Sequence, residues 1–283
     1  MDYPGVFCIS LDFELHWGCF EHMTLTDAAK QYFRNTREVI PQKLQLFEAN
    51  GIHVTWATVG MLFNRNQSEW EQNKPTLIPS FANPAVSAYE WINRHGFEGE
   101  QDPFHFAPGL IDRIQQTPHQ ELATHTYAHY FCLEAGQTKE QFAADMQKAC
   151  SLAEARGKKI RSLVFPRNQF NEDYLSVCRE LGITSVRSSP AIWYWSPATR
   201  SSLLKKFFRA GDAYIKMQPI KPVYLKDIRV DQGLPLLLPS TRLYRPWKAG
   251  QPLQNKLKLR RILNEMTEAA KKKAYMHLWW HPH

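Results

Sequence analysis

Two acidic side chains lie close together where the first apolar run of the chain ends. Asp12 and Glu14 follow a run that begins at Val6, and only Phe13 separates them. Because side chains alternate between the two faces of a strand, both carboxylates are expected on the same face. Two carboxylates at a buried strand end are costly unless a cation lies beside them. The pair therefore predicts a nearby metal ion or arginine, and a solvent-exposed strand end is the alternative.

Two histidines, His125 and His129, stand four residues apart after a later apolar run. If the segment forms a helical turn, this spacing brings both imidazoles to one side, where they can bind one metal ion. Thr126 occupies the position that a glutamate takes in zinc proteases of the His-Glu-x-x-His type, so that class is disfavoured. The alternative is a pair of hydrogen-bonded histidines at the corner between a strand and a loop.

Two further groups also follow apolar runs. Arg167 comes directly after Pro166, which ends the run 160–165 and so places a guanidinium just beyond a strand. The segment 274–280 is strand-like as well. Pro282 cannot extend its ladder of hydrogen bonds, so His281 is expected at the end of that strand.

The elements that must position these residues alternate along the chain. Seven apolar runs predict strands at 6–15, 52–59, 121–127, 160–165, 183–186, 234–238 and 274–280. Helices are predicted between them at 27–49, 138–156, 171–181 and 253–273. Thr138 and Gln141 form a capping-box pattern at the start of the second of these helices.

This alternation favours parallel strands that are joined by helical crossovers. Six or seven such units over 283 residues suit a TIM-like barrel better than a small open sheet. Reactive side chains of such barrels gather at the C-terminal ends of the strands, which is where the groups above lie. We expect a single domain over residues 1–283, with residues 68–120 as an elaborated loop and helical insertion between early strands.

Charge is distributed unevenly. Residues 1–150 hold 10 Lys and Arg against 18 Asp and Glu, whereas residues 151–283 hold 25 against 9. A basic half of this kind is typical of a surface for phosphates or anionic lipid headgroups, and a solvated basic face is the alternative. In the helix predicted at 253–273, an apolar stripe should face the strands, with the lysines in water or on anionic lipid. The stripe consists of Leu259, Ile262, Leu263 and Met266.

Composition points to a globular protein of a reducing compartment. Five widely spaced cysteines, without a Cys-x-x-Cys pair, argue against a disulfide framework and against a zinc ribbon. No stretch approaches the roughly 18 apolar residues of a membrane span. The first residues also lack the basic and apolar regions of a secretory signal. A cytoplasmic location is therefore expected.

Taken in order along residues 6–283, these groups resemble the polysaccharide deacetylase family, the carbohydrate esterases of the nodulation-factor deacetylase type. The shared features are a strand-end carboxylate pair, a His-[Ser/Thr]-x-x-His motif, an arginine beside a proline, and a late strand that delivers a histidine. The resemblance implies a distorted (β/α)7 barrel and a divalent metal ion, usually zinc. By position, it implies Glu14, His125 and His129 as the metal ligands.

The same resemblance implies three catalytic residues: Asp12 as general base, Arg167 as the group that orients Asp12, and His281 as general acid. Family members usually carry two adjacent aspartates. Here Phe13 separates the two acids, so the base and ligand roles of Asp12 and Glu14 can be exchanged.

Other features depart from the family pattern or compete with it. Arg167 follows Pro166, whereas the family order is arginine and then proline. His16 shares the expected face of the carboxylates and is a competing ligand. The Asp-plus-Trp motif that braces the acid histidine cannot be placed, and Arg187 with Trp193–Trp195 is a poor substitute.

The resemblance implies hydrolysis of an N-acyl group, N-acetyl above all, on an amino sugar, a polysaccharide or a glycan precursor. Without an export signal, a nucleotide-linked or lipid-linked precursor is the expected substrate, and the basic second half could contact an anionic membrane. Nucleic acid is not expected as a partner. Two alternatives are a metal-independent amidohydrolase of the allantoinase type on the same fold, and a non-catalytic barrel that binds glycan or phosphate.

Overall fold

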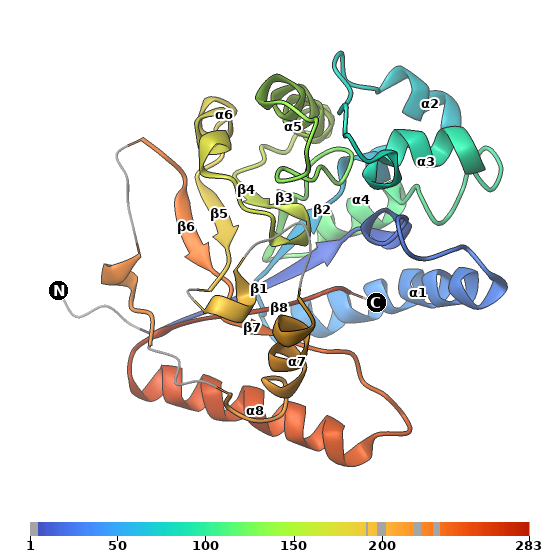
Figure 1. The fold of residues 1–283 in the computed structure, drawn as a ribbon. Coiled ribbons are helices and arrows are strands. Elements are labelled where there is room, and N and C mark those ends of the chain that lie inside the picture. Colours follow the sequence, from blue (N-terminus) through green and yellow to red (C-terminus); the bar gives the residue numbers. More distant parts are fainter. Residues whose placement is uncertain (1–4, 191, 197–201, 218–221, 229–232, 283) are drawn as a thin grey trace.

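The chain folds around one curled sheet of parallel strands (Figure 1). The structure is a computed structural model, and it describes residues 5–190, 192–196, 202–217, 222–228 and 233–282. The strands are β1 (Val6–Phe13), β2 (Val54–Thr58), β3 (Gln120–Thr124), β4 (Ser162–Val164), β5 (Ser185–Ser188), β6 (Leu236–Pro239), β7 (Arg242–Leu243) and β8 (Tyr275–Trp280). Their spatial order is β6-β5-β4-β3-β2-β1-β8-β7, and neighbouring strands pair in parallel.

The two end strands of this sheet are successive parts of one stretch. β6 pairs with β5, and β7, only two residues further on, pairs with β8. Between them, the Ser240 amide donates to the Ser188 carbonyl, and the Thr241 amide donates to the His277 carbonyl. The stretch therefore joins the two edges of the sheet and serves as a single seventh wall strand. This arrangement confirms the predicted distorted (β/α)7 barrel.

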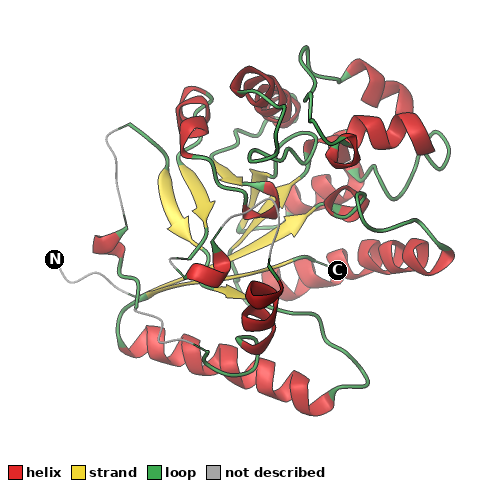
Figure 2. Cartoon of the chain, viewed as in Figure 1, coloured by secondary structure: helices red, strands yellow, loops and turns green. Residues whose placement is uncertain are grey.

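Helices surround the sheet on its outer side (Figure 2). They are α1 (Asp27–Ala49), α2 (Gln67–Gln72), α3 (Ala88–His95), α4 (Pro108–Gln116), α5 (Lys139–Glu154), α6 (Leu175–Glu180), α7 (Leu203–Gly211) and α8 (Pro252–Lys271). Thr138 and Gln141 form the capping box that the sequence predicts at the start of α5. The segment between β2 and β3 holds α2, α3 and α4. Among the described helices, none is long and apolar enough to cross a membrane.

The core contains large apolar side chains from both faces of β1 and β2. Phe13 and Trp56 are fully buried, and their rings meet edge to face with centroids 6.2 Å apart. Phe33 and Ile40 of α1 are equally buried. Strands of a parallel sheet are covered on both sides, which explains why a polar residue such as Asp12 is also enclosed.

The apolar stripe that was predicted for α8 does not face the strands as a unit. Ile262 is buried, but Leu259 and Leu263 are about half exposed. Lys258 is buried instead, and its ammonium group donates to the Pro246 carbonyl. The prediction is therefore wrong for these two leucines, because α8 lies on the barrel along the line of Asn255, Lys258 and Ile262.

Arg242, the first residue of β7, should be important for the stability of the closed barrel. It is 4% exposed, forms a fork on the Glu265 carboxylate of α8, and also donates to Asp212 at 2.8 Å. Because Arg242→Ala takes a cation from the buried Asp212 carboxylate and from the partly buried Glu265, we expect it to lower the free energy of unfolding in urea by about 3–5 kcal/mol. Lys272→Ala is the matched control. It removes an exposed partner of Glu268 and should cost about 0–1 kcal/mol. Equal losses in both variants would contradict the expectation.

Candidate metal centre

Three side chains from separate parts of the chain meet at the C-terminal end of the barrel. The Nε2 atoms of His125 and His129 each lie 3.3 Å from Oε2 of Glu14. All three residues are buried, and one ligand atom from each falls within 4.8 Å of the others. Glu14 directly follows β1, and His125 directly follows β3. The structure thus brings together the three residues that the sequence indicates as metal ligands.

The segment that carries the two histidines is a loop, so the expected helical turn is wrong. Thr126 and His129 have φ angles of 63° and 52°, which lie in the left-handed region that side chains other than glycine rarely adopt. Asp145 of α5 supports this conformation, because its carboxylate accepts from the amides of Tyr127 and Ala128 at 2.6 and 3.0 Å. Burial raises the pKa of Asp145 to about 7. The histidines therefore converge through an anchored loop.

Protonation at the cluster suits a metal ion. His125 Nδ1 lies 2.8 Å from the Val164 carbonyl and must donate to it, so Nε2 is the ring nitrogen that faces Glu14. Burial lowers the pKa of His129 despite Glu14 beside it, which favours the neutral imidazole. Burial alone would raise the pKa of Glu14, but His281, His125 and His129 hold it well below its usual value. Two imidazoles and one carboxylate are a common donor set for zinc.

The distances between the three candidate ligands also fit a bound zinc ion. Ligands at about 2.0–2.2 Å from a tetrahedral zinc ion stand about 3.3–3.5 Å apart, close to the observed separations of Glu14 from His125 and His129. Space for the carboxylate comes from Gly18, where an added Cβ would lie 1.9 Å from Oε1 of Glu14. The residues present therefore fit a bound divalent ion.

Asp12 forms a separate ion pair beside this cluster. Its two oxygens accept from Nη1 and Nη2 of Arg187 at 2.6 and 2.7 Å, and both residues are buried. Arg187 also donates to Ser10 and to Asn168, and its guanidinium lies 4.3 Å from the Trp279 ring. Burial alone would raise the pKa of Asp12, but Arg187 holds it below its ordinary value. Asp12 is therefore ionised near neutral pH.

The sequence indicated Arg167 for this contact with Asp12, and that expectation is wrong. Arg167 donates to Glu21, and its guanidinium lies 4.3 Å from the Phe131 ring. The reason is its position in a 3-10 turn beyond β4, with φ at 53°, whereas Arg187 lies within β5 and points into the barrel. Arg187 comes directly after the run 183–186, and this position at a strand end was the sequence signal that could have identified it.

The histidines near both ends of the chain have distinct surroundings. Nε2 of His281 lies 3.2 Å from Oε1 of Glu14, with its side chain 38% exposed, so it stands at the rim just after β8 as predicted. His277 is buried deeper, next to Ser10 at 2.9 Å, and burial lowers its pKa to about 3. His16 contacts His105 and the Met23 carbonyl through its two ring nitrogens, each at 2.8 Å. His16 therefore does not compete as a ligand.

Comparisons with known proteins agree with this arrangement. The sequence model of the polysaccharide deacetylase family matches residues 22–186, which include His125 and His129 and exclude Glu14 and His281. No curated protein sequence matches the chain.

Two solved structures show the same fold. A protein described as a polysaccharide deacetylase from Mycobacterium smegmatis is 13% identical, with a TM-score of 0.57 over 99% of this chain and 78% of that one. A 4-alpha-glucanotransferase from Thermococcus litoralis is 11% identical, with a TM-score of 0.50 over 98% of this chain and 33% of that one. At such identities the likeness concerns the fold alone.

Gly18→Ala should disturb the metal centre without touching a ligand. The new methyl group would occupy the space of the Glu14 carboxylate, so we expect zinc affinity to fall about 10–100-fold, as for other changes that misplace a ligand. Competition with a chromophoric chelator measures this. Gly109→Ala in α4 is the control, because an added Cβ there meets nothing within 4 Å. Wild-type affinity in Gly18→Ala would mean that Glu14 is not a ligand.

Proposed function

The chain belongs to the polysaccharide deacetylase family, and from that premise we propose that it hydrolyses an N-acyl group, N-acetyl above all, on an amino sugar. The observation that carries the proposal is the convergence of two acidic centres at one end of the barrel. Glu14 joins His125 and His129, while Asp12 is held separately by Arg187. One carboxylate is thus available for a metal ion and the other for a proton.

Glu14, His125 and His129 are the residues proposed to hold a divalent ion, zinc above all. When bound, such an ion supplies a Lewis acid that polarises the amide carbonyl and makes water a stronger acid. The protein's part is to orient the His125 ring, to favour the neutral form of His129 and to keep Glu14 ionised. The hydrogen bond from His125 to Val164 and the burial of His129 support this role.

Asp12 is the proposed general base. The Arg187 fork fixes the plane of its carboxylate and keeps it ionised, so a lone pair remains to accept the proton of the attacking water. Help of this kind contributes about 10²–10⁴-fold to the rate. Arg187 takes the orienting role that was first assigned to Arg167.

His281 is the proposed general acid. An amine departs with difficulty as its anion, so a proton must reach the nitrogen as the C–N bond breaks. His281 lies beside Glu14 and is partly exposed, so its imidazole can donate a proton to the nitrogen of a substrate that enters from solvent. An imidazole suits proton transfer near neutral pH.

The substrate is proposed to be a glycan precursor that is linked to a nucleotide or a lipid, met in the cytoplasm. The excess of Lys and Arg in residues 151–283 supports a phosphate-bearing substrate or contact with an anionic membrane. The metal-independent and non-catalytic alternatives have less support, since neither explains why two imidazoles and an ionised carboxylate converge.

Metal analysis together with amine release from a panel of N-acetyl amino sugars tests this proposal. We expect about one zinc-like ion per chain and release that a chelator abolishes and zinc restores. Release that is insensitive to chelation would favour the metal-independent alternative. Sugar binding without any release would favour the non-catalytic one.

Asp12→Asn and Glu14→Gln should separate the two carboxylates. Asp12→Asn should keep the metal and lose about 10²–10⁴-fold in kcat, because the base is removed while Glu14, His125 and His129 remain. It should also lower the free energy of unfolding, because Arg187 loses its ion pair. Glu14→Gln should lower metal affinity first, and excess zinc should restore part of its rate. Metal titration and steady-state kinetics on both variants give the result. The reverse pattern would exchange the two roles.

His281→Ala should lower kcat by about 10²–10³-fold while metal content stays unchanged. The loss should shrink with anilide substrates, whose less basic amines depend less on a proton from the enzyme as the C–N bond breaks. Steady-state kinetics across such a series provides the measurement. Loss of metal would make His281 a ligand instead, and unchanged kinetics with every substrate would reduce it to a rim residue.

A further inference from the structure

Helix α7 turns three of its four large apolar side chains away from the protein, and only Phe208 packs inward, on Trp193 and Tyr194. Leu203, Leu204 and Phe207, here called the α7 face, are 83%, 58% and 67% exposed. At 100° per residue these three side chains lie on one side of the helix. No residue of α7 is buried. Burying such side chains is worth about 1.5–3 kcal/mol each, so an amphipathic helix would ordinarily face them inward.

The opposite side of the same helix, which carries Lys205, Phe208 and Arg209, faces residues 193–196 of the loop after β5. The Lys205 ammonium donates to Ser196, and Arg209 donates to the Tyr194 carbonyl while its guanidinium lies 5.2 Å from the Trp195 ring. These polar contacts hold the helix in place with its apolar side outward. These contacts therefore fix the α7 face in an outward orientation, in which it is available to a binding partner.

The surroundings of the α7 face are cationic. α7 holds three basic residues and no acidic one, and residues 241–264 hold seven Lys and Arg without an Asp or Glu. Three of the seven do not add free surface charge, because Arg242 and Arg261 pair with Asp212 and Glu265 and Lys258 is buried. The other four are Arg245, Lys248, Lys256 and Arg260. The two regions touch, because Arg245 donates to the Arg209 carbonyl, and Asp212 just after α7 bonds Arg261 of α8. Exposed apolar side chains recur there at Trp247 and Leu253.

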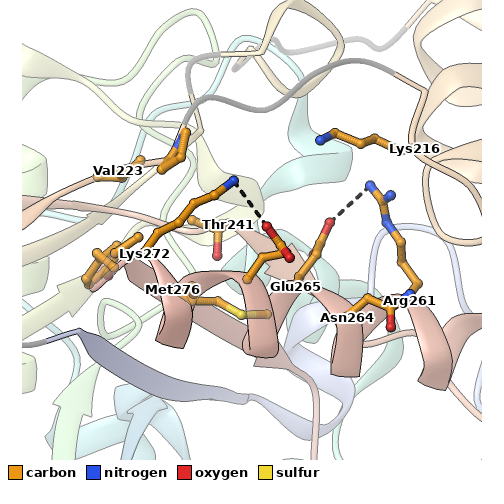
Figure 3. A pocket seen from close by; sticks show the side chains of 13 residues that line it. Lys216, Val223, Thr241, Arg261, Asn264, Glu265, Lys272 and Met276 are labelled. Atoms are coloured by element: carbon orange, nitrogen blue, oxygen red, sulfur yellow. Dashed lines mark ion pairs between the residues drawn. The ribbon is translucent and has the colours of Figure 1, made fainter.

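The acids of α8 offset only part of this charge. Glu265 and Glu268 line a pocket of about 320 Å³ between α8 and β8, where they pair with Arg261 and Lys272 (Figure 3). The outer side of α8 therefore presents Lys256 and Arg260 beside exposed leucines.

We propose that the α7 face docks the protein on the surface of an anionic lipid bilayer. Exposed leucines and an aromatic ring among lysines and arginines are the pattern of a helix that lies in a membrane interface. The charge complementarity favours anionic lipid over a second copy of this chain, because two such basic surfaces would repel each other. Each basic residue near the bilayer contributes about 1 kcal/mol, or roughly fivefold in affinity.

The position of α7 relates this docking to the metal centre. The chain leaves β5 at the end of the barrel that holds Asp12 and must return to the opposite end to begin β6. On the way, Asp212 bonds Arg242, which is level with Leu278 of β8, and Val223 then reaches Tyr275 at the start of β8. Through Lys205 and Arg209, α7 packs on Ser196 and Tyr194, in the loop that follows β5 at the end of the barrel that holds the metal centre. If the proposed function holds, this placement favours an amino sugar that is carried on a membrane lipid.

Vesicle flotation tests the docking directly. We expect the wild type to bind vesicles of phosphatidylcholine with phosphatidylserine at least tenfold better than phosphatidylcholine alone, and less well at high salt. Leu203→Ser with Phe207→Ser should lose at least tenfold of this binding. Leu46→Ser in α1 is the matched control, since Leu46 is as exposed as Leu204. Equal binding of the wild type and the double variant, or no preference for anionic vesicles, overturns the proposal. So does a wild-type dimer in ultracentrifugation that the double variant abolishes without any lipid binding.

A second arm separates this proposal from the proposed function. His125→Ala should still bind the vesicles, because docking does not need the metal centre. On a lipid-linked N-acetyl amino sugar in anionic vesicles, the double variant should be at least tenfold slower, with an unchanged rate on a soluble N-acetyl sugar. Vesicle binding without hydrolysis of either substrate would leave the docking and defeat the proposed function. Equal rates of both proteins on the lipid-linked substrate would defeat the assignment of substrate class.

Discussion

The buried pair of Asp12 and Arg187 is the interaction on which the rest of the site depends. It spans the inside of the barrel from β1 to β5, strands that are not neighbours in the sheet. Removing either partner would leave an uncompensated charge in the interior, which is among the most destabilising changes that a core can suffer. Ser10, Asn168 and Trp279 complete the surroundings of the guanidinium. One ion pair thereby ties β1, β5, β8 and the turn after β4 to a common geometry.

This pair also explains how two carboxylates so close in sequence can have different chemistry. Asp12 meets a cation that never loses its charge, and Glu14 meets three imidazoles whose charge depends on their surroundings. Phe13 between them is fully buried in the core and holds the two acids at different levels of the barrel. Asp12 and Glu14 therefore have different partners although only one residue separates them.

Much of the fold could be predicted from the sequence, because it depends on local signals. The seven strand runs, the capping box at Thr138 and the order of the reactive groups all have a short-range origin. Arg187 was missed because its partner lies 175 residues away, and only the register of the closed barrel decides which arginine reaches Asp12. The loop at Thr126 was missed because its left-handed residues depend on Asp145 of another helix. The exposure of Leu259 and Leu263 in α8 likewise depends on which side of the helix packs on the barrel, and hydrophobic periodicity alone does not determine that side.

The strands β3 and β4 are joined by little backbone pairing, since their register contains the single pair Thr124 and Leu163. The hydrogen bond from His125 to the Val164 carbonyl lies at this point and acts as an extra rung of the ladder. The same imidazole that faces the metal centre thus also fastens two strands together. An ion bound at Nε2 of His125 would therefore also restrain the contact between β3 and β4, and metal binding should make this part of the barrel wall more rigid.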